Sequence, residues 1–263
     1  MEKIKTIIEK EWAEVFKNRL VLFTVAFLPL MLTALPLITL GSMQGLGTAD
    51  INTADSLPDE FFGELCTGLS EGDCTQLYLL SIYVLLFMIL PVMIPVSISA
   101  YSIVGEKTTR SLEPLLATPI TTMELLAGKI IAAIIPAVLA TWLSFAVFLL
   151  GAKFMVNDIV FARLLEPLWF LAIFLVGPLL ALLGVTVSII ISSRVNDPRV
   201  AEQLSGVVVL PIILMVVGQS TGLILLSKDL ILLVGAIIAL LDVGLLYFSS
   251  KAFVRETILT RWK

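Results

Sequence analysis

Hydrophobic residues along this chain gather into six long runs, separated by shorter segments that carry most of the charges. Each run has about 20 residues, enough for an α-helix to cross a hydrocarbon core of roughly 30 Å. A spanning segment must be helical, because backbone groups find no water in the bilayer. The pattern predicts an all-α polytopic membrane protein, 1–263 as a single transmembrane domain, with spans at about 20–41, 77–104, 129–151, 167–191, 205–227 and 230–249.

The first segment, 1–19, has a helical pattern of its own ahead of the first span. Its apolar residues fall on one helical face at Ile4, Ile7, Ile8, Trp12, Val15 and Phe16, with charges on the other sides. Lys10 and Glu14 have the spacing of a pair one helical turn apart. We expect an amphipathic helix lying along the inner membrane surface, or alternatively a helix packed on a partner protein.

Basic residues decide which ends face the cytoplasm. All but three of the 17 lysines and arginines lie in 1–19, 105–129, 192–204 and 250–263. The exceptions are Lys153, Arg163 and Lys228. This asymmetry places both termini in the cytoplasm and makes 42–76 an acidic extracellular loop of a protein in the cell membrane.

Two cysteines, Cys66 and Cys74, lie in the outer loop, where the compartment favours disulfides. We expect a bridge between them, with two free thiols as the alternative. Prolines interrupt the spans at Pro29, Pro36, Pro91, Pro95, Pro136, Pro178 and Pro211. Pro91 and Pro95 stand one turn apart in the second span, which makes a bend there the clearest expectation.

The segment GEKTTRSLEPLLATPITTMELLAGK, 105–129, is charged and proline-broken between two apolar spans. Ser111 suits a helix N-cap with Pro114 in the first turn, and Pro119 breaks the chain after Thr118. Thr121 and Glu124 have the spacing of a capping box that starts the third span. The result is a short leucine-bearing cytoplasmic helix that must pack on something, either its own membrane domain or a soluble partner.

This segment resembles the signature of ABC-2-type permeases, the membrane subunits of ATP-binding-cassette transporters. The similar residues are Gly105–Lys107, Leu112–Pro119 and Leu126–Lys129, and the tail from Phe253 to Trp262 is also similar to the ends of some such permeases. Thr108, Arg110 and Ser111 depart from the usual pattern, which affects the register of the motif. The resemblance implies a coupling helix in 105–128, seated in a groove of a separate ATPase subunit, with an N-terminal elbow helix beside it.

Carried onto this sequence, the resemblance gives a set of partner contacts, of which Glu113 is the first choice. The expected contacts are Glu106, Arg110, Glu113, Leu115, Leu116, Thr118 and Pro119. It also implies an exporter with two ATPase subunits and a second permease subunit, identical or different. No P-loop is present, since Gly128-Lys129-Ile130 lacks the Ser/Thr and Met123 stands at the first glycine. ATP and Mg would therefore bind the partner, and no cofactor is expected on this chain.

Few polar residues fall inside the spans. Asp242 is the only ionisable residue well within one, and such residues are costly there. It is predicted to contact a cation or substrate or to carry a proton, or else to bond another helix or reach Lys251 or Arg255. The stretch 218–222 interrupts the fifth span, so Gln219, Ser220 and Thr221 either line the pathway or serve helix packing.

Composition narrows the function further. The chain has no histidine, which excludes histidine triads, HExxH metal sites and histidine proton relays. A net charge of −4 gives no reason to expect nucleic acid as a partner. The leading prediction is the permease of an ABC exporter; the alternative is an ATP-independent secondary transporter or channel, which usually carries several intramembrane charges or broken helices. An intramembrane enzyme is a third possible class, but it is disfavoured because the spans contain no convincing group of polar residues for catalysis.

Overall fold

The computed structural model describes residues 2–17, 19–45, 70–109, 120–221, 223 and 227–252, and every regular element within them is helical. The elements are α1 (Glu2–Lys17), α2 (Arg19–Gly45), α3 (Glu71–Phe87), α4 (Leu90–Thr108), α6 (Thr122–Met155), α7 (Asp158–Leu164), α8 (Pro167–Phe170), the π-helix η4 (Leu171–Val176), α9 (Gly177–Ser192), α10 (Pro198–Ser205), the 3-10 helix η5 (Gly206–Val209), α11 (Leu210–Ser220) and α12 (Lys228–Ala252).

The structure has six helical segments long and apolar enough to span a membrane, which confirms the predicted number. They are Val21–Met43, Gly72–Thr108, Met123–Met155, Asp158–Ser192, Pro198–Ser220 and Lys228–Ser249. The fifth span was predicted at 205–227, and in the structure it lies seven residues earlier in the chain, at Pro198–Ser220. This segment begins at Pro198 with the polar turns of α10 and ends at Ser220, so Gln219 and Ser220 lie at the end of the span and do not interrupt it.

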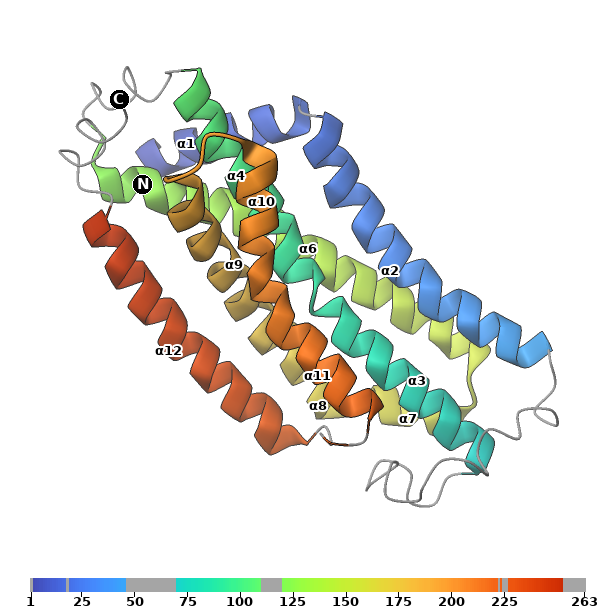
Figure 1. Ribbon diagram of the computed structural model, residues 1–263. Helices are drawn as coiled ribbons and strands as arrows, with labels where there is room; N and C mark the ends of the chain where they lie inside the picture. Colours follow the sequence, from blue (N-terminus) through green and yellow to red (C-terminus); the bar gives the residue numbers. More distant parts are fainter. Residues whose placement is uncertain are drawn as a thin grey trace.

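The bundle is built around α4, which packs against α9 on one side and α6 on the other. Figure 1 shows α2 and α12 along opposite edges of the bundle, where α2 packs on α6 and α12 packs on α9. A Cβ atom on Gly184 of α9 would lie 3.1 Å from the carbonyl oxygen of Val92. This small residue therefore lets α9 approach the α4 backbone closely, as is common in membrane bundles.

The second span bends at the predicted place. α3 ends at Phe87 and α4 begins at Leu90, with Pro91 in the first turn of α4. Proline has no N–H to give to the carbonyl four residues before it, so the continuous hydrogen-bond ladder fails there. The fourth span carries a second irregularity, because its middle turn is the π-helix η4 directly before Gly177 and Pro178.

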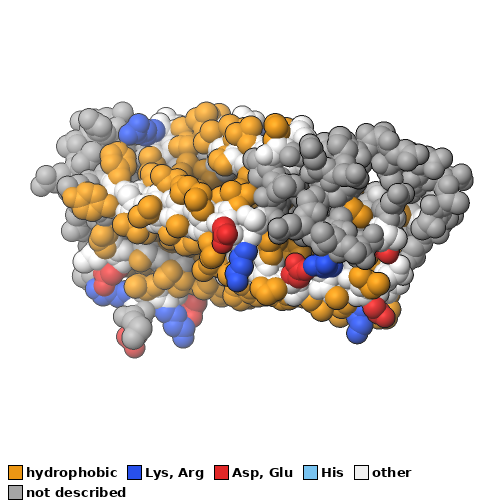
Figure 2. Space-filling model, turned by 90° about the horizontal axis from the view of Figure 1, so that it is seen from below, with side chains coloured by type: hydrophobic (Ala, Val, Ile, Leu, Met, Phe, Trp, Pro, Cys, Tyr) orange, Lys and Arg blue, Asp and Glu red, His pale blue; other side chains and the backbone are white. Residues whose placement is uncertain are grey.

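Apolar side chains cover the outside of this bundle. Leu30 of α2, Leu214 of α11 and Leu240 of α12 are 68%, 67% and 74% exposed. Figure 2 shows one face on which hydrophobic atoms predominate among the coloured side chains and charged groups are few. A surface of this kind suits lipid as its surroundings, as expected for a multi-pass membrane protein.

The N-terminal helix forms as predicted, and its apolar face contacts the bundle. α1 packs on α6, and Ile7 and Val15 are buried there. The indole nitrogen of Trp12 donates a hydrogen bond of 3.0 Å to the carbonyl of Ala132. A Cβ on Gly128 would lie 2.7 Å from Ile7 Cγ2, so the glycine lets the two helices touch. Part of this face therefore packs on the chain's own membrane domain, while the position of α1 relative to the membrane surface or to a partner protein stays a prediction.

A buried charge cluster as the candidate functional site

The two ends of the central segment are held by well-formed helices. α4 continues to Thr108, and α6 starts with the predicted capping box, which the structure confirms. The Glu124 amide donates to Thr121 Oγ1 at 3.2 Å, and the Thr121 amide donates to Glu124 Oε2 at 2.8 Å. Lys3 of α1 lies 3.7 Å from the same carboxylate. The end of α4, the start of α6 and α1 therefore meet at one end of the bundle (Figure 1).

Four charged side chains form a cluster where these three helices meet: Lys10, Glu11, Glu106 and Lys129. The Lys129 Nζ atom lies 2.6 Å from Glu11 Oε1 and 2.8 Å from Glu106 Oε2. Lys10 Nζ lies 2.5 Å from the other Glu106 oxygen. Ser102 completes the network, because its hydroxyl donates to Glu11 Oε2 at 2.5 Å and accepts from Lys129 Nζ at 2.6 Å.

The cluster is almost closed to solvent. Glu11, Glu106 and Lys129 are 2%, 4% and 6% exposed, and only Lys10 reaches the surface to a larger extent. Two carboxylates and two ammonium groups balance in charge. Buried charges are tolerated when paired in this way, whereas removing one partner costs roughly 3–5 kcal/mol. The cluster therefore ties α1, α4 and α6 to one geometry more firmly than a surface ion pair would.

Lys10 and Glu11 are the members of the cluster that lie outside the spans, on α1. Burial by itself would lower the pKa of Lys10, but the hydrogen bond to Glu106 and the charges of Glu106, Glu14 and Glu11 together raise the pKa above 10.5. Lys10 also lies 3.6 Å from Glu14, which confirms the predicted pair on α1. The ammonium group stays charged at any physiological pH, so the network does not titrate through this residue.

Three carboxylates in and beside the cluster are close enough together to be considered as metal ligands. Ligand atoms of Glu11, Glu14 and Glu106 lie within 4.8 Å of one another. However, Lys129 and Lys10 already contact the oxygens of Glu11 and Glu106 that a cation would need. The donor set is neutralised by lysines, and it does not fit a metal ion.

The end of α4 is also held on its opposite side. Lys107 Nζ donates to the carbonyl oxygens of Ser193 and Val195, at 3.4 and 3.2 Å, in the link that precedes α10. About three helical turns earlier in α4, the hydroxyl of Ser97 hydrogen-bonds Glu202 of α10. The last turns of α4 therefore connect α1 and α6 on one side with α9 and α10 on the other.

Of the predicted partner contacts, only Glu106 lies among the described residues. The others, Arg110, Glu113, Leu115, Leu116, Thr118 and Pro119, lie outside them. Glu106 has an internal role that the sequence did not reveal, because its carboxylate is buried against two lysines. Glu11 was missed entirely, although one signal marks it: a charged residue at a position of the α1 apolar face, between Ile7 and Val15.

The predicted polar residues near the C-terminal end of the fifth span form hydrogen bonds within the chain. Gln219 is 5% exposed, and its Nε2 atom donates to Ser81 of α3 at 2.5 Å, while Tyr78 donates to its backbone carbonyl at 3.3 Å. Ser220 and Thr221 are exposed, and both hydroxyls donate to the carbonyl of Val217 at 2.9 Å. Gln219 thus joins α11 to α3.

Two further predictions concern Asp242 and the cysteines. Asp242 is buried in α12, and neither of its carboxyl oxygens has a hydrogen-bond partner among the described residues. The side chains of Lys251 and Arg255, considered as partners for it, lie outside those residues. Cys74 is disulfide-bonded. Cys66 is also outside the described residues, so its pairing stays a prediction.

Six apolar spans and an apolar outer surface define a polytopic membrane protein. The profile of the family described as "ABC-2 family transporter protein" matches residues 5–232. The chain belongs to this family. No curated protein matches it. It is therefore a membrane permease of an ABC transporter, a transmembrane subunit that associates with an ATPase subunit and with the bilayer.

Proposed function

We propose that this permease exports its substrate across the cell membrane, working as one of two permease subunits, identical or different, with two separate ATPase subunits. Both termini lie in the cytoplasm in this proposal, as the basic residues indicate. The ATPase subunits bind ATP and Mg and dock on the segment 105–128. Contacts come from Arg110, Glu113, Leu115, Leu116, Thr118 and Pro119, with Glu113 foremost.

The observation that carries this proposal is the ion pair that closes the central segment. Glu106 lies at the start of the segment and Lys129 directly follows it, and their charged atoms lie 2.8 Å apart. Both also contact α1, through Lys10 and Glu11. Because both ends of the segment belong to one buried network, the segment moves together with α1. A displacement of the segment by the ATPase subunit therefore reaches α4 and α6 at the same time.

In this mechanism Glu106 positions the segment and does not itself touch the ATPase. Its oxygens are 2.5 and 2.8 Å from two ammonium groups inside the chain, and little of the side chain faces outward. Movement of the loop is transmitted to α4, whose far end meets the break at Met88 and Ile89. Closure of the ATPase pair would thus tilt the inner part of the second span against its outer part.

The test uses the complete complex of permease and ATPase in lipid nanodiscs. Replacing Glu113 with Ala should remove co-purification of the ATPase or most of the permease-dependent ATPase rate. Replacing Glu106 with Gln should keep co-purification but reduce that rate by roughly fivefold or more, since coupling energies are about 1–3 kcal/mol. The matched control is Glu9→Gln, because Glu9 is exposed on α1 and its ion pair among the described residues is with the exposed Lys5, at 3.8 Å.

Two checks keep the outcome decisive. Size-exclusion profiles establish that each variant is folded, and Glu106→Asp, which keeps the charge, should retain more coupling than Glu106→Gln. Co-purification and ATPase rate that remain at control levels in both the Glu113 and Glu106 variants would refute the proposal. Purified permease alone should show no ATP hydrolysis.

A further inference from the structure

The second and fifth spans each contain a break in their helix, and the two breaks border one cavity. α3 gives way to α4 at Met88 and Ile89, whose amides donate to the carbonyl oxygens three residues earlier, at 3.0 Å each. α10 gives way to α11 through the 3-10 helix η5, directly before Pro211 in the first turn of α11. A 3-10 stretch inside a longer helix often marks a hinge. Both spans can therefore bend at these breaks.

The segments beyond the two breaks, α3 and α11, are bound to each other. They pack side by side at the end of the bundle away from α1 (Figure 1). The Gln219 side chain of α11 donates to Ser81 of α3 at 2.5 Å, and the Tyr78 hydroxyl donates to the Gln219 carbonyl oxygen at 3.3 Å. Because a buried amide left without a partner costs free energy, we expect the two helices, here called the α3–α11 pair, to move together.

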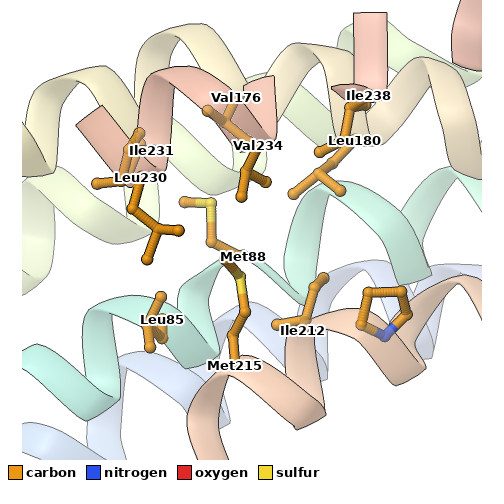
Figure 3. A pocket seen from close by; sticks show the side chains of 12 residues that line it. Leu85, Met88, Val176, Leu180, Ile212, Met215, Leu230, Ile231, Val234 and Ile238 are labelled. Atoms are coloured by element: carbon orange, nitrogen blue, oxygen red, sulfur yellow. The ribbon is translucent and has the colours of Figure 1, made fainter. Parts of the chain in front are cut away.

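An apolar cavity of about 80 Å³ lies between this pair and other helices of the bundle. The wall on the side of the pair and its breaks consists of Leu85, Met88, Pro211, Ile212 and Met215. The opposite wall belongs to η4, α9 and α12 and includes Ala172 and Val234. Figure 3 shows Met88 between Ile212 and Met215 on one side and the side chains of α12 on the other. All lining residues are apolar, so the two walls can move against each other without losing a side-chain hydrogen bond between them.

The helices on the other side of the breaks are tied to one another by polar groups. Ser97 of α4 hydrogen-bonds Glu202 of α10, and Ser188 of α9 donates to the Val96 carbonyl oxygen of α4 at 3.2 Å. The buried charge cluster also binds α4 to α1 and α6. α1, α4, α6, α9 and α10 therefore form one body, and the α3–α11 pair is joined to it through the two breaks.

We propose that the α3–α11 pair is a gate that swings across the apolar cavity, with hinges at Met88–Ile89 and at η5. The inference rests on the function proposed above, because α4 carries the movement of the central segment to the first hinge. α11 has 11 residues and is therefore about 16 Å long. A tilt of about 15°, the size of a known subunit rotation in an allosteric protein, displaces the far end of α11 by about 4 Å. Contacts of α3 with α2 and α7 oppose a larger tilt.

The test measures distances between nitroxide spin labels in the full-length permease in nanodiscs, without an ATPase. Cys74 is disulfide-bonded and does not take the label, and protein without added cysteines gives the background. The substitutions Ser220→Cys and Leu233→Cys place labels on exposed positions of α11 and α12, across the gate. The reference labels, at Val200→Cys of α10 and Tyr247→Cys of α12, avoid the gate. The gate labels should give two distances about 4 Å apart, or a distribution broader than the reference by about that amount.

Filling the cavity should remove this spread. Ala172→Leu places a larger side chain in the wall opposite the gate, and Val234→Phe is a second variant in case the first does not fold. Each should narrow the distribution of the gate labels to the width of the reference. The matched control is Ala236→Leu, because Ala236 is exposed on α12. Labels at Leu79→Cys of α3 and Leu233→Cys should vary like the gate labels, because α3 moves with α11.

Each outcome decides the question. If the gate labels give one distance as narrow as the reference, no gate moves and the inference fails. It also fails if the cavity-filling variants keep the full spread, if Ala236→Leu narrows it equally, or if the label on α3 stays fixed while that on α11 moves. These measurements need no ATPase, so the gate can fail while the loop variants above still uncouple the complex. It can also move although those variants leave coupling unchanged, and the two proposals are tested separately.

Discussion

Replacing Lys129 with Met removes the cation at the centre of the buried cluster. Lys129 is bonded to Glu11 at 2.6 Å and to Glu106 at 2.8 Å, and its side chain is 5% exposed. Without it, Glu106 keeps its ion pair with Lys10, and Glu11 keeps the hydrogen bond from the Ser102 hydroxyl. One negative charge is then left uncompensated in a buried site, which costs roughly 3–5 kcal/mol.

Thermal unfolding of the purified permease in detergent measures this loss. A domain of this size loses about 2–4 °C in Tm for each kcal/mol, so we expect a fall on the order of 10 °C. The double variant Lys129→Met with Glu11→Gln removes the uncompensated charge and should recover a large part of the loss, giving a clear coupling energy. Lys5→Met is the control, because the exposed Lys5–Glu9 pair at 3.8 Å is worth well under about 1 kcal/mol.

Two results would contradict this prediction. If Lys129→Met is as stable as Lys5→Met, the cluster does not hold the helices together. If the double variant is no more stable than Lys129→Met alone, the loss comes from packing and not from an unpaired charge. Either result would remove the physical basis for treating α1 and the central segment as one moving unit.

Three further predictions concern the contacts around this core. Gly128→Val should cost about 1–3 kcal/mol and increase protease access to α1, because a Cβ there would lie 2.7 Å from Ile7 Cγ2; Gly105→Val, with nothing within 4 Å of its Cβ, is the control. Lys10→Met should lower the Tm relative to wild type by a constant amount up to pH 10.5 and by less above it, since a raised pKa adds stability that is lost as pH rises through the folded value; a difference that instead grows in alkali would contradict this. Gln219→Leu should cost roughly 1–3 kcal/mol by separating α11 from α3, measured as a fall in Tm, and an unchanged Tm would show that its bond to Ser81 is unimportant.

Features that depend on near neighbours could be predicted from the sequence. The six spans follow from long apolar runs, because hydrophobicity summed over about 20 residues outweighs local detail. The capping box at Thr121 and Glu124 and the break before Pro91 follow from residues within one or two turns. The start of the fifth span could not be placed, because polar α10 continues directly through η5 into apolar α11.

The candidate site depends on distant residues, so only part of it could be predicted. Glu106 was identified as important from its motif, but its lysine partners were not, because Lys10 precedes it by 96 residues. Glu11 and Lys129 are 118 residues apart, and nothing in either neighbourhood indicates the other. Their approach depends on how α1 crosses the start of α6, which Gly128 permits.

The sequence by itself determined the membrane class, the number of spans, the bend at Pro91 and the helix that precedes the first span. These properties follow from apolar length, proline geometry and periodicity, which act within a few turns of the chain. Only the tertiary structure decided that α1 packs on its own domain, that Glu106 faces two lysines and that Asp242 is buried with no hydrogen-bond partner among the described residues. The physical reason is that the cost of a buried charge depends on which helices surround it, and helix packing joins residues about a hundred positions apart.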